Sequence, residues 1–191
     1  QPALLFITEA GILLRHGMND AGVGICGNAL RNNLEAPADQ GMPAHVLRRR
    51  ALRHTNLADA YRTLADTPRS HSGNHLMADA EGSAVDVEAV PGRVFTLEPE
   101  GGILVHSNHF QHPDAKDALD DHGVHTHSDT LYRDCRVRDA LTARRGSVTI
   151  DDIKSALQDH HGYPMSVCRH PNPKSESTGF TLVSTVMDLN D

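Results

Sequence analysis

The chain has 191 residues, which is long enough for residues 1–191 to form a single domain with its own hydrophobic core, although an apolar content of 38% is modest for such a core. A formal net charge of −7 argues against a nucleic-acid partner, and no apolar run approaches the roughly 20 residues of a membrane span. The three cysteines are widely spaced and form no CxxC pair, which favours a reducing, cytoplasmic compartment over a disulfide framework.

The first third of the chain predicts antiparallel strands followed by helices. The strands, separated by turn signals, are expected at residues 2–9, 12–16 and 23–30. Gly24 and Gly27 lie in the third strand, where glycine typically allows another backbone or a ligand to come close. Two helices should follow, one starting at Pro43 and one capped by Asn56 and ended by Pro68.

The rest of the chain predicts a second block of strands and a second pair of helices. The strands, separated by Pro/Gly turns, are expected at residues 74–79, 84–90, 93–97 and 103–109. Residues 112–129 are polar and favour a surface loop. Helices should follow at residues 131–141 and from the N-cap Thr149 to about residue 160, before a last strand at 181–189. This order predicts an α+β architecture with helices packed on sheets.

The apolar strand expected at residues 103–109 leads into a dense group of polar side chains. Asn108 at its end and Asn28 at the end of an earlier strand are candidate oxyanion donors, because an amide offers two hydrogens without a charge. The alternative is that each asparagine only satisfies loop backbone. Arg169 follows an apolar segment and either pairs with a carboxylate for structural reasons or serves the site.

The histidines and cysteines allow two further hypotheses. One is a His-rich metal site built from His106, His109 and His112, which lie at three-residue spacing, and the histidines that follow at positions 122, 125 and 127. No Cys–His zinc spacing supports it, and hydrogen-bonding or surface histidines are favoured, so neither a metal nor another cofactor is expected. The other is a reactive thiol at Cys168, which has His160, His161 and His170 nearby, although a small core residue is favoured there.

Several segments together resemble one known family. The segments are residues 6–11 (FITEAG), 17–23 (GMNDAGV), 28–30 (NAL), 105–109 (VHSNH), 159–160 (DH), 163–169 (YPMSVCR) and 185–188 (TVMD). In this order they resemble the acyl-coenzyme A:6-aminopenicillanic acid acyltransferase family, also called peptidase family C45.

The resemblance implies an N-terminal-nucleophile (Ntn) hydrolase fold, an αββα sandwich of two antiparallel sheets between helical layers. It implies an amide hydrolase or N-acyltransferase that forms a thioester on a cysteine, which self-cleavage exposes and whose α-amino group is the base. In this reading Asn108 stabilises the oxyanion, Asn28 is a second donor, and Arg169 orients the nucleophile or its neighbouring carboxylate. The substrate would be a small amide or acyl thioester.

The family's nucleophilic cysteine would lie upstream of residue 1, and Gln1 has neither thiol nor hydroxyl. We therefore expect the chain to be incomplete at both ends, to be inactive by itself, and to need an N-terminal segment or partner chain. A homo-oligomer is also compatible with the sequence. The alternative functions are a non-catalytic binding module with the same fold and the His-rich metal-binding domain.

Overall fold

A six-stranded antiparallel sheet forms the centre of the computed structural model, which describes residues 1–37, 40–174 and 179–190. The strands follow one another in sequence order across the sheet. Their bounds are β1 Leu4–Ile7, β2 His16–Asn19, β3 Val23–Cys26, β4 Gly73–Asp79, β5 Ala84–Val90 and β6 Arg93–Leu97. Successive side chains of a strand point to opposite faces, so the sheet presents two different surfaces.

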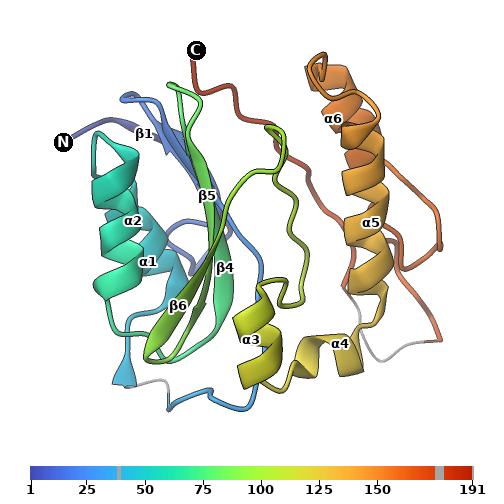
Figure 1. The fold of residues 1–191 in the computed structure, drawn as a ribbon, viewed down its shortest axis with the longest axis horizontal. Helices are drawn as coiled ribbons and strands as arrows, with labels where there is room; N and C mark the ends of the chain where they lie inside the picture. The colour runs from blue at the N-terminus through green and yellow to red at the C-terminus, as the bar shows by residue number, and fades with distance from the viewer. Residues whose placement is uncertain (38–39, 175–178, 191) are drawn as a thin grey trace.

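Two helices, α1 Ala44–Ala51 and α2 Leu57–Asp66, cover one face of the sheet (Figure 1). The main hydrophobic core lies between these helices and the sheet, and it includes Leu47 and Leu64 from the helices and Met77 from β4. Asn56 caps α2 by accepting a hydrogen bond from the backbone N–H of Asp59 at 2.9 Å, as the sequence predicts.

The structure confirms three of the four strands predicted in the second block: β4 starts one residue earlier than expected, and β5 and β6 have the expected bounds. In the first block, the strand expected at residues 12–16 is wrong. Leu14 in this stretch is fully buried but belongs to the turn that precedes β2. An apolar residue that is buried in a turn therefore gave the same sequence signal as a strand. The third strand, β3, ends at Cys26, four residues earlier than expected.

The strand expected at residues 103–109 does not form, and its only bridge joins Ile103 to Glu100 in a turn. The strand expected at residues 181–189 is likewise extended chain without ladder partners in the described part of that segment. Where two sheets were expected, the described residues therefore form one sheet. Two extended segments, residues 98–112 and 179–190, lie on its other face and separate it from the last two helices (Figure 1).

The polar stretch 112–129 is not one loop, because it contains α3 Pro113–Ala118 and α4 His122–Thr126. The side chains of His112 and Asp121 cap the two helices. Each helix has only five or six residues, which is too short for a helical period to be recognised in the sequence. The longer α5 Asp129–Thr142 and α6 Ile150–Leu157 form the outer layer (Figure 1). Thr149 and Asp152 form a capping box at the start of α6.

None of the helices among the described residues is both long enough and apolar enough to cross a lipid bilayer.

Candidate active site

A buried polar cluster on the second face of the sheet holds the extended segment 105–111 in place. Asp86 and Glu88 on β5 are both completely buried, and the Nε2 atom of His106 lies 2.8 Å from a Glu88 carboxylate oxygen. Asn74 on β4 donates its amide to Asp86 at 3.1 Å. These hydrogen bonds satisfy the buried carboxylates, as burial of a charge requires.

Glu88 also accepts hydrogen bonds from the backbone N–H groups of Gln111 and His112, the second at 3.2 Å. A side-chain carboxylate therefore takes over the role that a neighbouring strand would have had for this backbone. Within residues 103–109 other side chains do the same: Asn28 donates to the carbonyl oxygens of His106 and Ser107, and Thr130 accepts from the backbone N–H of Asn108, so this stretch forms no strand.

The cluster changes the protonation of its members. Burial alone would lower the pKa of His106, but the hydrogen bond to Glu88 and the charges of Asp86 and Glu88 outweigh it, so the pKa of His106 is raised. Burial raises the pKa of Asp86, and the nearby His106 opposes this rise. The cluster therefore favours a proton held on His106 at the base of the site.

Asn108 projects from this anchored segment, and both ends of its side chain are engaged. Its Nδ2 group donates to the carbonyl oxygen of Ala29 at 3.2 Å, and its Oδ1 atom accepts from Arg133 on α5 at 3.0 Å. The backbone N–H of Asn108 donates to the hydroxyl of Thr130 at 2.7 Å. Because Arg133 binds the oxygen, the amide orientation is fixed and one Nδ2 hydrogen is left for a ligand.

Arg169 lies beside Asn108 and pairs with Asp129 on α5. The same carboxylate oxygen of Asp129 accepts from the Nε of Arg133 at 2.8 Å, so one acid serves two guanidinium groups. A pocket of about 160 Å³ lies here, lined by Ala29, Arg31, Asn108, Gly123, His127, Arg133 and Arg169. Arg31, Arg133 and Arg169 all line the pocket, and this group of guanidinium charges suits an anion.

Asn28 does not line this pocket. Its Nδ2 group donates to the carbonyl oxygens of His106 and Ser107, at 3.1 Å each, and so supports the segment that carries Asn108. Its backbone N–H donates to Asn74. In this arrangement the Asn28 amide is occupied by backbone, which matches the loop-satisfying alternative considered for it.

Arg133 and Asp129 are the site residues that sequence reasoning missed. They were hidden in a polar helix, yet their i,i+4 spacing is the usual signature of an ion pair on a helix face.

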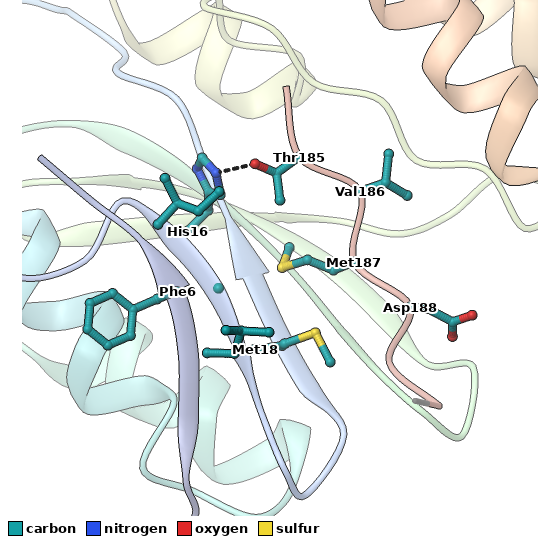
Figure 2. A pocket seen from close by; sticks show the side chains of 10 residues that line it. Phe6, His16, Met18, Thr185, Val186, Met187 and Asp188 are labelled. Atoms are coloured by element: carbon teal, nitrogen blue, oxygen red, sulfur yellow. Dashed lines mark hydrogen bonds between the residues drawn. The ribbon is translucent and has the colours of Figure 1, made fainter. Parts of the chain in front are cut away.

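A second, larger groove of about 430 Å³ lies where the C-terminal segment crosses β1 and β2 (Figure 2). Figure 2 shows the side chains of Met18 and Met187 between the strands and the segment, and the ring of His16 bonded to Thr185 at 2.8 Å. Burial, followed by the charges of Arg48 and Arg15, lowers the pKa of His16. The groove is mainly apolar and is separate in its lining from the Asn108 pocket.

The glycines of β3 allow the close approaches that the sequence predicted. A Cβ atom on Gly24 would lie 2.6 Å from the Leu189 side chain of the C-terminal segment. One on Gly27, just after β3, would lie 2.1 Å from the carbonyl oxygen of Asn74. The C-terminal segment thus rests directly on the β3 backbone at Gly24, and the absence of a side chain on Gly27 allows the backbone of Asn74 to come close.

No cysteine lines the Asn108 pocket as the described residues form it. Burial raises the pKa of the Cys26 thiol to about 11, and the charge of Asp86 adds to the effect, so this thiol is a poor nucleophile.

The fold is that of an Ntn hydrolase. A crystal structure of a mutant conjugated bile acid hydrolase from Clostridium perfringens superposes with a TM-score of 0.52 at 14% identity, over 82% of this chain and 63% of that chain. The sequence is more specific: the acyl-coenzyme A:6-aminopenicillanic acid acyl-transferase family matches residues 1–191, and the chain belongs to this family.

One curated relative is the acyl-coenzyme A:6-aminopenicillanic-acid-acyltransferase 40 kDa form of Emericella nidulans. It is 28% identical over 193 aligned residues, which include 98% of this chain and 50% of the relative. The chain therefore spans about half the length of the curated relative that it matches.

Proposed function

We propose that this chain is the oxyanion-stabilising part of an amide hydrolase or N-acyltransferase that works through a thioester on a cysteine. The cysteine thiolate attacks the substrate carbonyl, and the carbonyl oxygen becomes an oxyanion. Collapse of this intermediate breaks the C–N bond, and the amine leaves with a proton. Water or a second amine then attacks the thioester, releasing the thiolate and completing hydrolysis or acyl transfer.

The observation that carries this proposal is the fixed amide of Asn108 in a positively charged pocket. Arg133 holds Oδ1 at 3.0 Å, and this directs the Nδ2 group to the other side, where one hydrogen binds Ala29. The remaining hydrogen is then oriented before substrate arrives. A preoriented neutral donor of this kind contributes about 3–4 kcal/mol to an acyl-transfer barrier.

Arg169 has a positioning role in this proposal. Its guanidinium is tied to Asp129, which also holds Arg133, so the three side chains form one unit around Asn108. A substrate group or nucleophile that binds in the pocket meets their net positive charge. Asn28 supports the site indirectly, because its amide holds the carbonyl groups of His106 and Ser107. It becomes a second oxyanion donor only when it releases these carbonyl groups.

The nucleophile comes from outside this chain in our proposal. The α-amino group of an N-terminal cysteine has an ordinary pKa of about 7.7–8.0, which suits a base that takes the thiol proton at neutral pH. Cys26 cannot substitute for it, because its thiol pKa lies near 11. The substrate is a small amide or acyl thioester, and a non-catalytic binding module is the alternative that the experiment must exclude.

The test uses the full-length protein that contains this chain. We expect mass spectrometry to find self-cleavage immediately before a cysteine, and a mass increase equal to one acyl group when the cleaved protein meets a reactive thioester. The matched control replaces that cysteine with alanine, which should abolish both. A folded precursor that stays uncleaved and takes up no acyl group would contradict the proposal and favour the binding module.

A further inference from the structure

A second cluster of chemically active side chains lies after α6, outside the lining of the Asn108 pocket. The Nε2 atoms of His160 and His170 are 2.9 Å apart, and the Cys168 Sγ atom is 3.9 Å from the same His170 nitrogen. The three atoms all lie within 4.8 Å of one another. Three residues within ten positions of one another in the sequence thus bring their ligand atoms close together.

The loop that carries these side chains is held by its own hydrogen bonds. The backbone N–H of Cys168 donates to the carbonyl oxygen of Asp159 at 3.0 Å, and that of His170 donates to Pro164 at 2.8 Å. The Asp159 carboxylate pairs with Arg136 on α5, which ties the loop to the helical layer. The cluster is therefore arranged before any ligand binds, so little ordering is needed on binding.

The separations fit a tetrahedral zinc-class ion. Zn–N bonds of about 2.0–2.1 Å and a Zn–S bond of about 2.3 Å place nitrogen atoms about 3.3 Å apart and nitrogen and sulfur about 3.6 Å apart. The observed 2.9 Å and 3.9 Å lie on either side of these values. The third separation, between His160 and Cys168, is within 4.8 Å, so closing movements of about 1 Å would seat the ion.

We propose that His160, Cys168 and His170 form a binding site for a divalent zinc-class ion. Two imidazoles and a thiolate are the donor set that zinc prefers over magnesium or calcium. On binding, the Cys168 thiol releases its proton to solvent and the S–Zn bond forms, while each imidazole binds through a neutral Nε2. His160 is exposed, so the fourth position is open to water or an external ligand.

The site has a direct structural link to the Asn108 pocket. Two of its ligands, Cys168 and His170, flank Arg169, whose guanidinium pairs with Asp129 in that pocket. A bound ion would fix the backbone on both sides of Arg169. This inference goes beyond the acyl-transfer proposal and does not depend on it, because the site is defined by its own three ligands.

The test is a titration of the metal-free full chain, without a histidine tag, with Co²⁺ as a spectroscopic probe. We expect one equivalent to produce a cobalt–thiolate charge-transfer band and the intense visible bands of a tetrahedral site, both removed by added Zn²⁺. The Cys168→Ser and His170→Asn variants should lose these bands and weaken binding by more than about 100-fold, since even the loss of a residue that only hydrogen-bonds to a metal ligand costs about 10–100-fold.

The matched controls are His161→Asn and Cys135→Ser, which remove an exposed histidine and an exposed thiol that lie outside the cluster. Both should keep the bands and the affinity. Binding without a thiolate band, equal binding by Cys168→Ser, or no binding of one equivalent would overturn the site and leave a hydrogen-bonded histidine pair. Circular dichroism of each variant establishes that a lost band does not reflect a lost fold.

Discussion

On the face of the sheet that α1 and α2 cover, Leu47, Leu64 and Met77 pack into a continuous apolar core. On the opposite face, the middle of the sheet carries Asp86 and Glu88, which are equally buried but hydrogen-bonded. The first face needs only complementary shape. The second needs hydrogen-bond partners for its polar atoms: Asn74 binds Asp86, while His106 and the backbone of Gln111 and His112 bind Glu88.

Two buried histidines show the same contrast. His75 on β4 faces α1 and accepts a hydrogen bond from the Arg48 Nε at 3.2 Å, so its Nδ1 carries no proton. Burial, and next the charge of Arg48, hold the pKa of His75 well below its usual value. His106 lies against two carboxylates on the other face, and its pKa is raised. The comparison teaches that equal burial fixes opposite charge states, depending on the partner.

The largest effects are expected when one buried residue is removed from each face of the sheet. Glu88→Ala leaves His106 and two backbone N–H groups without their buried acceptor, and should lower the free energy of unfolding by about 3–5 kcal/mol. Leu64→Ala should cost about 2–5 kcal/mol through a cavity. Denaturant unfolding measures both.

The two variants should differ in the function of the folded fraction. Glu88→Ala also releases the segment that carries Asn108, so turnover should fall, whereas Leu64→Ala should leave turnover per folded molecule unchanged. Glu88→Gln, which keeps an acceptor oxygen, serves as the conservative control and should lose less stability. Equal turnover in all three would mean that Glu88 does not position the site.

The next effect concerns Asn108 itself. In the full-length protein, Asn108→Ala should reduce turnover about 10²–10³-fold, because it removes the proposed oxyanion donor. Its matched control is Asn56→Ala on the other side of the sheet, which deletes the α2 cap and should cost about 1 kcal/mol of stability with no change in turnover. A similar loss of turnover in both variants would assign the effect to stability.

The two faces should also differ in the pKa values of their buried histidines. NMR titration should find the pKa of His106 above 6.5 and that of His75 well below it. Because His106 binds its proton more tightly when folded, its contribution to stability is full below about pH 6.5 and is lost as pH rises through the folded pKa. His75 has the opposite sign: its contribution is present above about pH 6.5 and is lost as pH falls. Titration of both histidines at one common pKa would refute the assignment of partners.

The smallest expected effect separates the cysteines. At pH 8, iodoacetamide should label Cys135, which is exposed on α5, and leave Cys26 unlabelled until the protein is denatured. A thiol with a pKa of about 11 is ionised to only about one part in a thousand at this pH. Peptide mass spectrometry reads out the labelling. Fast labelling of native Cys26 would show that the extended segments on this face of the sheet do not shield β3.

Local sequence signals predicted the parts of the fold that local interactions decide. The turns that bound β5 and β6 and the cap Asn56 act within a few residues, and all were predicted correctly. The segment 103–109 was not, because side chains from distant parts of the chain, Asn28 and Thr130, bind its backbone in place of a neighbouring strand. No local pattern contains that information.

The candidate site was predictable to a similar extent. The resemblance to the family selected Asn108 and Arg169, and the structure brings these two residues to the same pocket. It could not select Arg133, which fixes the Asn108 amide from a helix 25 residues further along the chain. The convergence of His160, Cys168 and His170 also depends on how one loop folds back on itself, which spacing alone did not reveal.

The sequential strand order of the sheet has a consequence for folding. Each strand pairs with the one before it in the chain, so the sheet can grow by successive additions. Apart from β3 and β4, whose paired residues lie 50 to 56 positions apart, these pairings are local, whereas the contacts that build the pocket are long-range: Asn28 meets Ser107 across 79 residues, and Asp129 meets Arg169 across 40. Closing such long loops is slow and entropically costly, so we expect the pocket to assemble last and to open first in hydrogen exchange.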